Sequence, residues 1–211
     1  MNDATALLIV DVQYGFMPGG GLPVAGGDAV VPVINRIAPR FANVVLTQDW
    51  HPRDHVSFAA RHPARQPFET IALPYGEQVL WPTHCVQGTR DAALHDGLQV
   101  DHAQLIIRKG FRRDIDSYSA FVEADRRTTT GLAAWLHARG ITRLWLCGLA
   151  TDFCVAWSAL DARAAGFEVT VIEDACRAID RDGSLARAWA DMAAAGVRRV
   201  FSERVFEQNR P

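Results

Sequence analysis

Short apolar runs alternate along the chain with longer segments whose apolar residues recur at helical spacing. A continuous apolar run such as Ala6 to Val10 is typical of a strand that is buried on both faces of a parallel sheet. Apolar residues at every third or fourth position, as in the segment that begins at Asp28, predict an amphipathic helix instead. By these criteria the sequence predicts strands at residues 6–10, 43–47, 104–109, 143–147, 168–172 and 198–201. It predicts helices at residues 28–41, 128–140, 154–165 and 184–195.

This alternation of strands and helices predicts a single α/β domain that spans residues 1–211. Helices that connect parallel strands cover both faces of the sheet, so a three-layer sandwich with a mainly parallel sheet is expected. Residues 52–103 interrupt the pattern, and a loop of that length is usually functional or disordered. The aromatic residues of this segment, among them Phe58 and Trp81, indicate an ordered, packed insertion over the site.

Residues whose side chains can take part in catalysis lie at or after the ends of four predicted strands. Asp11 ends the first strand, Asp49 follows the second, Lys109 ends the third and Cys154 follows the fourth. In open α/β sheets, sites lie beyond the carboxyl ends of the strands. Each residue alone has a structural explanation as a turn or helix cap, a solvated strand end or a small buried thiol. Together they favour one shared site.

The stretch around Cys154 reads as a strand, a tight turn and the start of a helix. Thr151 or Asp152 is predicted to cap that helix, which places the thiol in a first turn where the helix dipole favours an anion. We therefore expect the thiol to ionise more easily than a free cysteine and to act as a nucleophile. Asp11 is the natural base, and Lys109 is the cation that orients the carboxylate and the thiolate. Acyl transfer fits these groups best, with backbone N–H groups of the turn as an oxyanion hole.

A second group of polar residues has the composition of a metal site. Asp49 and His51 are separated by one residue, so both can point the same way from an extended segment. His84, from the long insertion, would complete a carboxylate with two imidazoles, a ligand set for zinc, manganese or iron with positions left open. The spacing of Asp49 and His51 alone is equally typical of a turn. His55 is a candidate extra ligand that could equally orient the loop or hold a metal-bound water.

The composition argues against several classes of partner. The chain has 22 Lys plus Arg and 24 Asp plus Glu, a formal net charge of −2, which disfavours nucleic acid and acidic membrane surfaces. No apolar run approaches the roughly 18 residues of a transmembrane helix, and the N-terminus lacks the basic region of a secretory signal. The four cysteines form no C-x-x-C pair. We therefore expect a reduced, cytoplasmic protein without nucleic-acid or membrane partners, and the oligomeric state is left open.

Five segments, in their order along the chain, resemble the nicotinamidase branch of the isochorismatase-like cysteine hydrolases. They are Asp11-Val12-Gln13 with Phe16, Asp49-Trp50-His51-Pro52, Trp81-Pro82-Thr83-His84-Cys85-Val86-Gln87-Gly88-Thr89, Lys109-Gly110, and Gly148-Leu149-Ala150-Thr151-Asp152-Phe153-Cys154-Val155. The resemblance extends from about residue 6 to about residue 175. The cysteine-centred segment, the Asp and the Lys are typical of the whole superfamily, whereas the second and third segments are typical of nicotinamidases.

The resemblance carries expectations about fold and site. It implies a Rossmann-like, six-stranded parallel sheet of order 3-2-1-4-5-6 and a cis peptide bond between Leu149 and Ala150. This bond would turn the N–H groups of Ala150 and Cys154 toward an oxyanion. It also implies a triad of Asp11, Lys109 and Cys154, a divalent metal (Zn, Fe or Mn) bound by Asp49, His51 and His84, and a substrate pocket lined by Phe16, Trp81 and Tyr118. The conformation and role of residues 62–79 stay open, with a lid as one interpretation.

The activity that the resemblance implies is hydrolysis of nicotinamide to nicotinate and ammonia through a cysteine thioester, with pyrazinamide as a second substrate. One alternative is a different amide hydrolase of the same superfamily. An isochorismatase is a weaker alternative, because it would need neither the Cys nucleophile nor the metal ligands. A third alternative, from another class, is a metal-binding or thiol-redox sensor without turnover.

Overall fold

The computed structural model describes residues 3–207, which build a six-stranded sheet in which all neighbouring strands are parallel. Its strands are β1 (Thr5–Val10), β2 (Asn43–Asp49), β5 (Leu105–Lys109), β6 (Arg143–Leu149), β7 (Glu168–Arg177) and β8 (Arg198–Val200). They lie in the order β5-β2-β1-β6-β7-β8, which is 3-2-1-4-5-6 when the strands of this sheet are numbered alone. The predicted fold class and strand order are therefore confirmed.

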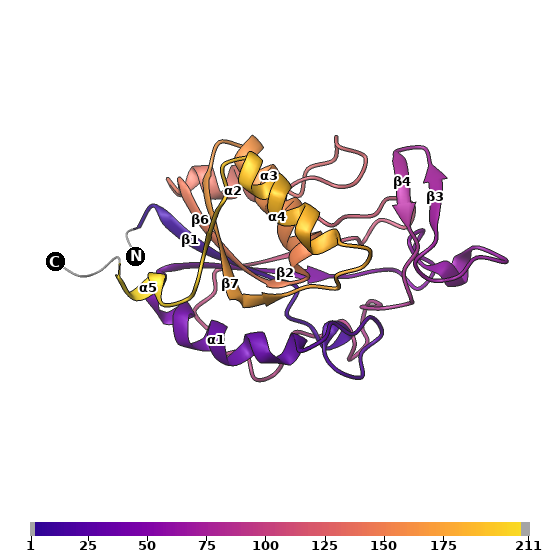
Figure 1. Ribbon diagram of the computed structural model, residues 1–211, viewed down its shortest axis with the longest axis horizontal. Helices are drawn as coiled ribbons and strands as arrows, with labels where there is room; N and C mark the ends of the chain where they lie inside the picture. The colour runs from indigo at the N-terminus through magenta and orange to yellow at the C-terminus, as the bar shows by residue number, and fades with distance from the viewer. Residues whose placement is uncertain (1–2, 208–211) are drawn as a thin grey trace.

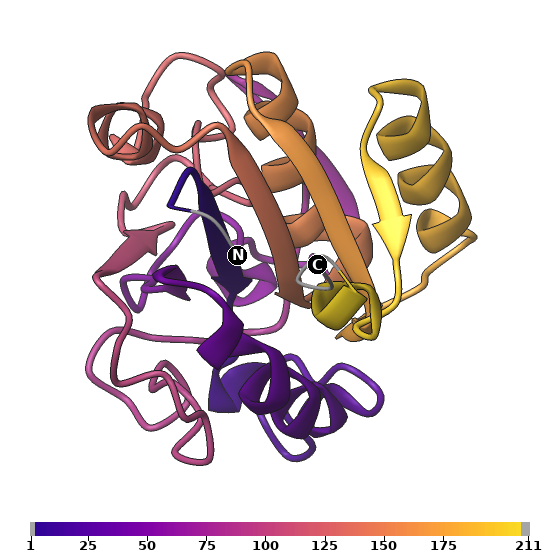
Figure 2. The ribbon, with the colours of Figure 1, turned by 90° about the vertical axis from the view of Figure 1, so that its left-hand side faces the viewer.

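Helices cover both faces of this sheet, as Figures 1 and 2 show. The helices α1 (Val30–Ile37) and α5 (Arg204–Glu207) lie on one side, and α2 (Leu132–Ala138), α3 (Ala156–Ala164) and α4 (Ser184–Ala194) lie on the other. Every residue of β1 is buried, which explains why this strand reads as an unbroken apolar run. Short 3-10 turns occur at Tyr14–Phe16, Gly27–Ala29, Ala38–Arg40 and Ala59–Arg61. Among the described residues, no helix has the length and apolarity that a membrane span requires.

Several elements differ in extent from their predicted bounds. The strands β2, β6 and β7 continue beyond residues 47, 147 and 172, because the residues that follow these positions stay in the hydrogen-bond ladder. Helix α2 starts only at Leu132, since Thr129 pairs with Val122 and the Thr130 hydroxyl donates to the carbonyl oxygen of Ala120. The helix expected from residue 154 begins earlier, as a π-helical turn, η5 (Thr151–Val155), that leads into α3.

The long segment of residues 52–103 contains a hairpin that the sequence pattern did not reveal. Its strands β3 (Thr70–Leu73) and β4 (Gly76–Val79) pair antiparallel and stand apart from the main sheet (Figure 1). Strands of four residues are too short to show a clear alternation of apolar and polar positions. The expected packing of the segment holds, because Phe58 and Trp81 are buried.

Candidate active site

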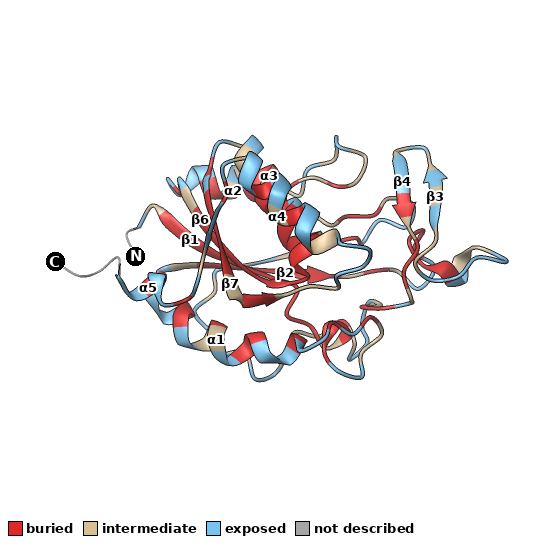
Figure 3. Cartoon of the chain, viewed as in Figure 1, coloured by how far each residue is buried: buried red, intermediate tan, exposed pale blue. Residues whose placement is uncertain are grey.

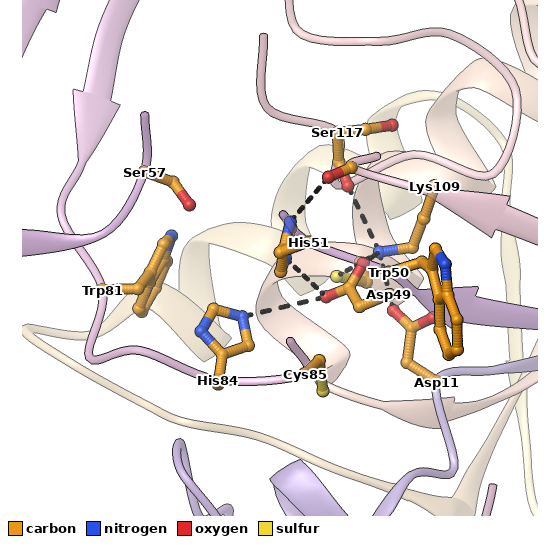
Figure 4. A network of polar contacts seen from close by, with 12 residues as sticks. Asp11, Asp49, Trp50, His51, Ser57, Trp81, His84, Cys85, Lys109 and Ser117 are labelled. Atoms are coloured by element: carbon orange, nitrogen blue, oxygen red, sulfur yellow. Dashed lines mark hydrogen bonds and ion pairs between the residues drawn. The ribbon is translucent and has the colours of Figure 1, made fainter. Parts of the chain in front are cut away.

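The carboxyl ends of β1, β2 and β5 bring Asp11, Asp49 and Lys109 together (Figure 4), and Cys154 lies within contact distance of Lys109. The Lys109 Nζ atom lies 2.8 Å from Asp11 Oδ2 and 3.3 Å from Cys154 Sγ, and it also contacts Asp49 Oδ1. It donates a further hydrogen bond of 3.2 Å to the carbonyl oxygen of Ser117. The side chains of Lys109 and Asp11 are fully buried. A buried ammonium is tolerated only when anionic partners surround it, and two carboxylates do so here.

Asp11 occupies a left-handed backbone conformation, with φ 49°, directly after β1. Few non-glycine residues adopt this conformation, and hydrogen bonds from Thr47 hold it here. The Asp11 N–H donates to Thr47 Oγ1 at 3.1 Å, and the Thr47 hydroxyl donates to Asp11 Oδ1 at 2.6 Å. Burial raises the pKa of Asp11 to about 6, although Lys109 and the Thr47 hydrogen bond oppose the rise. A carboxylate with such a pKa is suited to act as a general base near neutral pH.

Cys154 lies in the π-helical turn, in a setting that differs from the expected one. No side chain caps this turn, and the Asp152 carboxylate instead accepts the N–H groups of Ile179 and Asp180 at 3.0 and 2.9 Å. Burial raises the pKa of the Cys154 thiol well above its ordinary value, and Lys109 offsets this only in part. The predicted cap and the predicted ease of ionisation are therefore wrong. A protonated, buried thiol needs a base before it can attack, and Asp11 lies close enough to serve.

The peptide bond between Leu149 and Ala150 is cis, as the resemblance implied. It immediately precedes the turn that carries Cys154.

Asp49, His51 and His84 form the second half of the site. Their candidate ligand atoms all lie within 4.8 Å of one another, and the three residues are buried. Asp49 Oδ2 is 3.5 Å from His51 Nε2 and 3.9 Å from His84 Nε2. The Nδ1 atoms of His51 and His84 each lie 2.8 Å from a carbonyl oxygen, of Gly110 and Pro82 respectively. A carbonyl only accepts, so each Nδ1 carries the hydrogen and each Nε2 is left to bind a cation.

The charges of these groups also fit a divalent cation. Burial disfavours the charge on Asp49, but Lys109 and His51 hold the pKa of its carboxyl well below the usual range. Burial and the neighbouring His51 lower the pKa of His84 to about 4, so this imidazole is neutral at neutral pH. The pKa of His51 is raised despite its burial, because the Asp49 carboxylate lies beside it. A cation that binds here therefore competes with a proton at His51.

Two neighbouring groups of potential ligands fit a metal less well. In the cluster of His51, His55 and Asp116, the His55 Nε2 donates to the carbonyl oxygen of Ile115 at 3.2 Å, and its Nδ1 accepts the Ser57 hydroxyl at 2.7 Å. Both ring nitrogens of His55 are thus engaged, so His55 orients the loop and is not a ligand in this arrangement. The cluster of Asp11, Asp49 and Cys154 already surrounds the Lys109 ammonium.

A narrow cavity connects the thiol with the candidate metal ligands. Its lining includes the predicted pocket residues Phe16, Trp81 and Tyr118, together with Phe153, Cys154, Asp49, His51 and His84. Its volume of 20 Å³ leaves room for about one water molecule. Trp81 and Phe153 also line an outer groove of 710 Å³. A ligand larger than water therefore enters only when the aromatic wall of the cavity, formed by Trp81, Tyr118 and Phe153, moves.

The sequence did not predict the supporting roles of two residues, Gln13 and Thr47. Gln13 holds the backbone of Asp49 at both ends, with its Nε2 donating to the Asp49 carbonyl at 2.8 Å and its Oε1 accepting the Asp49 N–H at 2.7 Å. Thr47 supports Asp11 as described above. Its only signal in the sequence is a hydroxyl directly after the apolar residues Val44 to Leu46. Gly110 leaves space for the His51 ring, because a Cβ atom at this position would lie 2.3 Å from His51 Cε1.

Comparisons with known proteins find one family and relatives that are named nicotinamidase or pyrazinamidase. Residues 5–202 match the isochorismatase domain family. The nicotinamidase of Acinetobacter baylyi is 60% identical over 200 residues, which cover 95% of this chain and 94% of that protein. The structure of an Acinetobacter baumanii nicotinamidase/pyrazinamidase has a TM-score of 0.96 at 58% identity and covers 97% of this chain and 99% of its own. A pyrazinamidase of Pyrococcus horikoshii, solved in complex with zinc, has a TM-score of 0.76 at 36% identity and covers 94% and 99% of the two chains.

Proposed function

The chain belongs to the isochorismatase family, and from that premise we propose that it is a nicotinamidase, which hydrolyses nicotinamide to nicotinate and ammonia. Pyrazinamide is a second substrate, since relatives over nearly the whole chain act on both amides. The observation that carries the proposal is that Cys154 and three candidate metal ligands line one aromatic cavity, while Lys109 contacts both the thiol and Asp11. Trp81 and His84 come from the segment of residues 52–103, so we treat that segment as an insertion over the site of a single domain.

The triad residues perform the acyl transfer. Asp11 takes the thiol proton of Cys154, and the sulfur attacks the carboxamide carbon. The oxyanion that forms is held by the backbone N–H groups of Ala150 and Cys154. Asp11 then returns the proton to the amine as the carbon–nitrogen bond breaks, which releases ammonia and leaves a thioester.

Hydrolysis of the thioester completes the cycle. Asp11 takes a proton from water, whose oxygen attacks the thioester carbon, and the carbon–sulfur bond breaks. The sulfur regains a proton from Asp11, the new carboxylic acid releases its own proton to water, and nicotinate leaves. Lys109 stays protonated throughout, because it lies between two carboxylates that raise its pKa well above the usual value despite its burial.

Asp49, His51 and His84 are proposed to hold a divalent metal, and zinc, iron and manganese all suit this ligand set. A metal bound there would supply an open coordination position for the pyridine ring nitrogen and would thus anchor one end of the substrate. The aromatic side chains of Phe16, Trp81 and Tyr118 enclose the ring, and the carboxamide is then presented to Cys154. Holding a flat ligand at both ends makes the attack effectively intramolecular.

A direct assay separates this function from its alternatives. Metal-loaded protein is mixed with nicotinamide, and both ammonia and nicotinate are measured. Equal amounts of the two products are expected. A sensor would bind metal and release neither product, and a different amide hydrolase would release ammonia only from other amides.

A cytoplasmic location stays a prediction, supported by four free cysteines.

A further inference from the structure

The β3–β4 hairpin is attached to the body of the protein by a side chain that the reaction does not use. Figure 3 shows that the hairpin is largely exposed, with a buried part in β4. That part is Gln78, whose exposed fraction is 2%, although Glu77 beside it is exposed. A buried amide on an otherwise exposed hairpin needs polar partners, because an unsatisfied donor or acceptor costs free energy.

The Gln78 amide has such partners on both sides. Its Nε2 donates to Asp116 Oδ2 and to the Val79 carbonyl, each at 2.7 Å, and its Oε1 accepts the Tyr75 hydroxyl at 2.9 Å. A longer contact of 3.3 Å joins Nε2 to the Tyr118 hydroxyl. The amide has two hydrogens for these three acceptors, so the bond to Tyr118 is the weakest. No other common side chain of this length supplies two donors and an acceptor together.

Two partners of Gln78, Asp116 and Tyr118, line the cavity, whereas Gln78 itself does not. Tyr118 is a wall residue, and its hydroxyl also accepts the Trp81 indole N–H at 2.9 Å. Asp116 and Tyr118 flank Ser117, whose carbonyl oxygen accepts a hydrogen bond from Lys109. The hairpin is thus connected through one amide to two wall residues and to the loop that contacts the catalytic ammonium.

We infer that Gln78 is a positioning residue that fixes the Tyr118–Trp81 wall and thereby limits the size of the ring that the site accepts. The inference rests on the proposed function. Because the cavity is nearly closed, the freedom of its aromatic wall decides which rings enter. With Gln78 in place, the hydrogen bonds at Tyr118 restrict how far Tyr118 and Trp81 move apart, to the width of a single six-membered ring. Without it, the wall moves apart more easily and a fused bicyclic ring enters.

The test compares the wild type with Gln78→Met, which keeps the side-chain length and removes the hydrogen bonds. Glu77→Met is the matched control, since it introduces the same residue at the exposed neighbouring position. The substrates are nicotinamide and quinoline-3-carboxamide, which keeps the relation of ring nitrogen to carboxamide and adds a fused ring. We expect Gln78→Met to lower the preference for nicotinamide, measured as the ratio of the two kcat/KM values, by about tenfold and to raise KM for nicotinamide. Glu77→Met keeps both quantities at wild-type values.

The ratio separates positioning from a loss of stability. A variant that is only partly folded loses active enzyme equally for both substrates, so its ratio and its KM are unchanged. An unchanged ratio and KM in Gln78→Met, including a bicyclic amide that stays below detection in both proteins, contradicts the inference. If Gln78→Met does not fold, Tyr118→Phe removes the hydroxyl that joins Gln78 to Trp81 and is expected to lower the ratio in the same direction. Failure of the wild type to hydrolyse nicotinamide would instead refute the proposed function.

Discussion

The Asp49 carboxylate joins the two halves of the site through its contact with Lys109. One of its oxygens contacts the Lys109 ammonium, and the other faces the Nε2 atoms of His51 and His84. Lys109 in turn contacts Asp11 and Cys154. A change at the metal ligands is therefore expected to alter the reactivity of the Cys154 thiol through the shared Asp49 carboxylate.

A change at Asp49 is expected to alter the thiol as well as metal binding. In metal-free Asp49→Asn protein, the Cys154 thiol loses a nearby negative charge that raises its pKa. The rate of alkylation of Cys154 by iodoacetamide at neutral pH should rise, by about tenfold for each unit by which the thiol pKa falls. His84→Gln is the matched control, because it also removes a metal ligand and leaves the contact of Asp49 with Lys109 in place. Equal alkylation rates in the two metal-free variants would show that Asp49 does not act on the triad.

The ionisation of Asp11 is expected to set the acid limb of the pH profile of kcat/KM. The base works only when it is ionised, and the pKa of Asp11 is raised to about 6, so kcat/KM should fall as the pH drops through about 6. The Thr47 hydrogen bond lowers this pKa, and Thr47→Val should therefore move the limb to higher pH. Thr170→Val, a buried substitution in β7, should leave it in place. Metal content is measured at each pH as a control. A limb that stays fixed or moves to lower pH in Thr47→Val would exclude Asp11 as the titrating base.

Gly110 controls the placement of a metal ligand. Its φ is +63°, and a Cβ atom would collide with the His51 ring. Gly110→Ala should displace that ring and lower metal affinity by roughly ten- to a hundredfold, the range seen when the groups that orient a ligand are lost. Gly140→Ala is the matched control, because φ is +68° there and a Cβ would meet nothing within 4 Å. Metal titration of both variants measures the effect. Similar metal affinities in Gly110→Ala and Gly140→Ala would show that any loss comes from backbone strain and not from displacement of the His51 ring.

The nucleophile is tested by removal of the thiol. Cys154→Ala should lower turnover at least about a thousandfold, because the triad acts as a unit. Its fold and metal content should stay as in the wild type. Cys85, Cys147 and Cys176 are also buried, but none of them contacts Lys109, so their alanine variants should retain activity. Ammonia release, metal analysis and circular dichroism give the three readings. Near-wild-type turnover by Cys154→Ala would rule out a covalent mechanism through this residue.

Local patterns predicted the parallel sheet and the meeting of Asp11, Asp49, Lys109 and Cys154 beyond its strands, whereas the strand order was implied by the resemblance. Continuous apolar runs mark buried strands, and parallel topology then places residues such as Asp11 and Lys109 at one edge. Thr47 and Gln13 are 36 residues away from the residues they support, so no local pattern reveals their supporting roles. The ionisation of Cys154 was predicted wrongly because burial, which depends on the packing of the whole domain, outweighs Lys109. The β3–β4 hairpin was missed because its strands are too short to show a period.

The central claim is that a metal held by Asp49, His51 and His84 anchors the ring nitrogen of nicotinamide while Cys154 attacks its carboxamide. The most direct measurement is kcat/KM for nicotinamide and for benzamide, a near isostere without the ring nitrogen, in metal-loaded and in chelator-treated protein. With metal, nicotinamide should be preferred by on the order of 10⁴-fold, since benzamide leaves a binding group unpaired. Chelation should abolish most of that preference by lowering the value for nicotinamide. Benzamide turnover as fast as that of nicotinamide, or nicotinamide hydrolysis that survives chelation unchanged, would contradict the account.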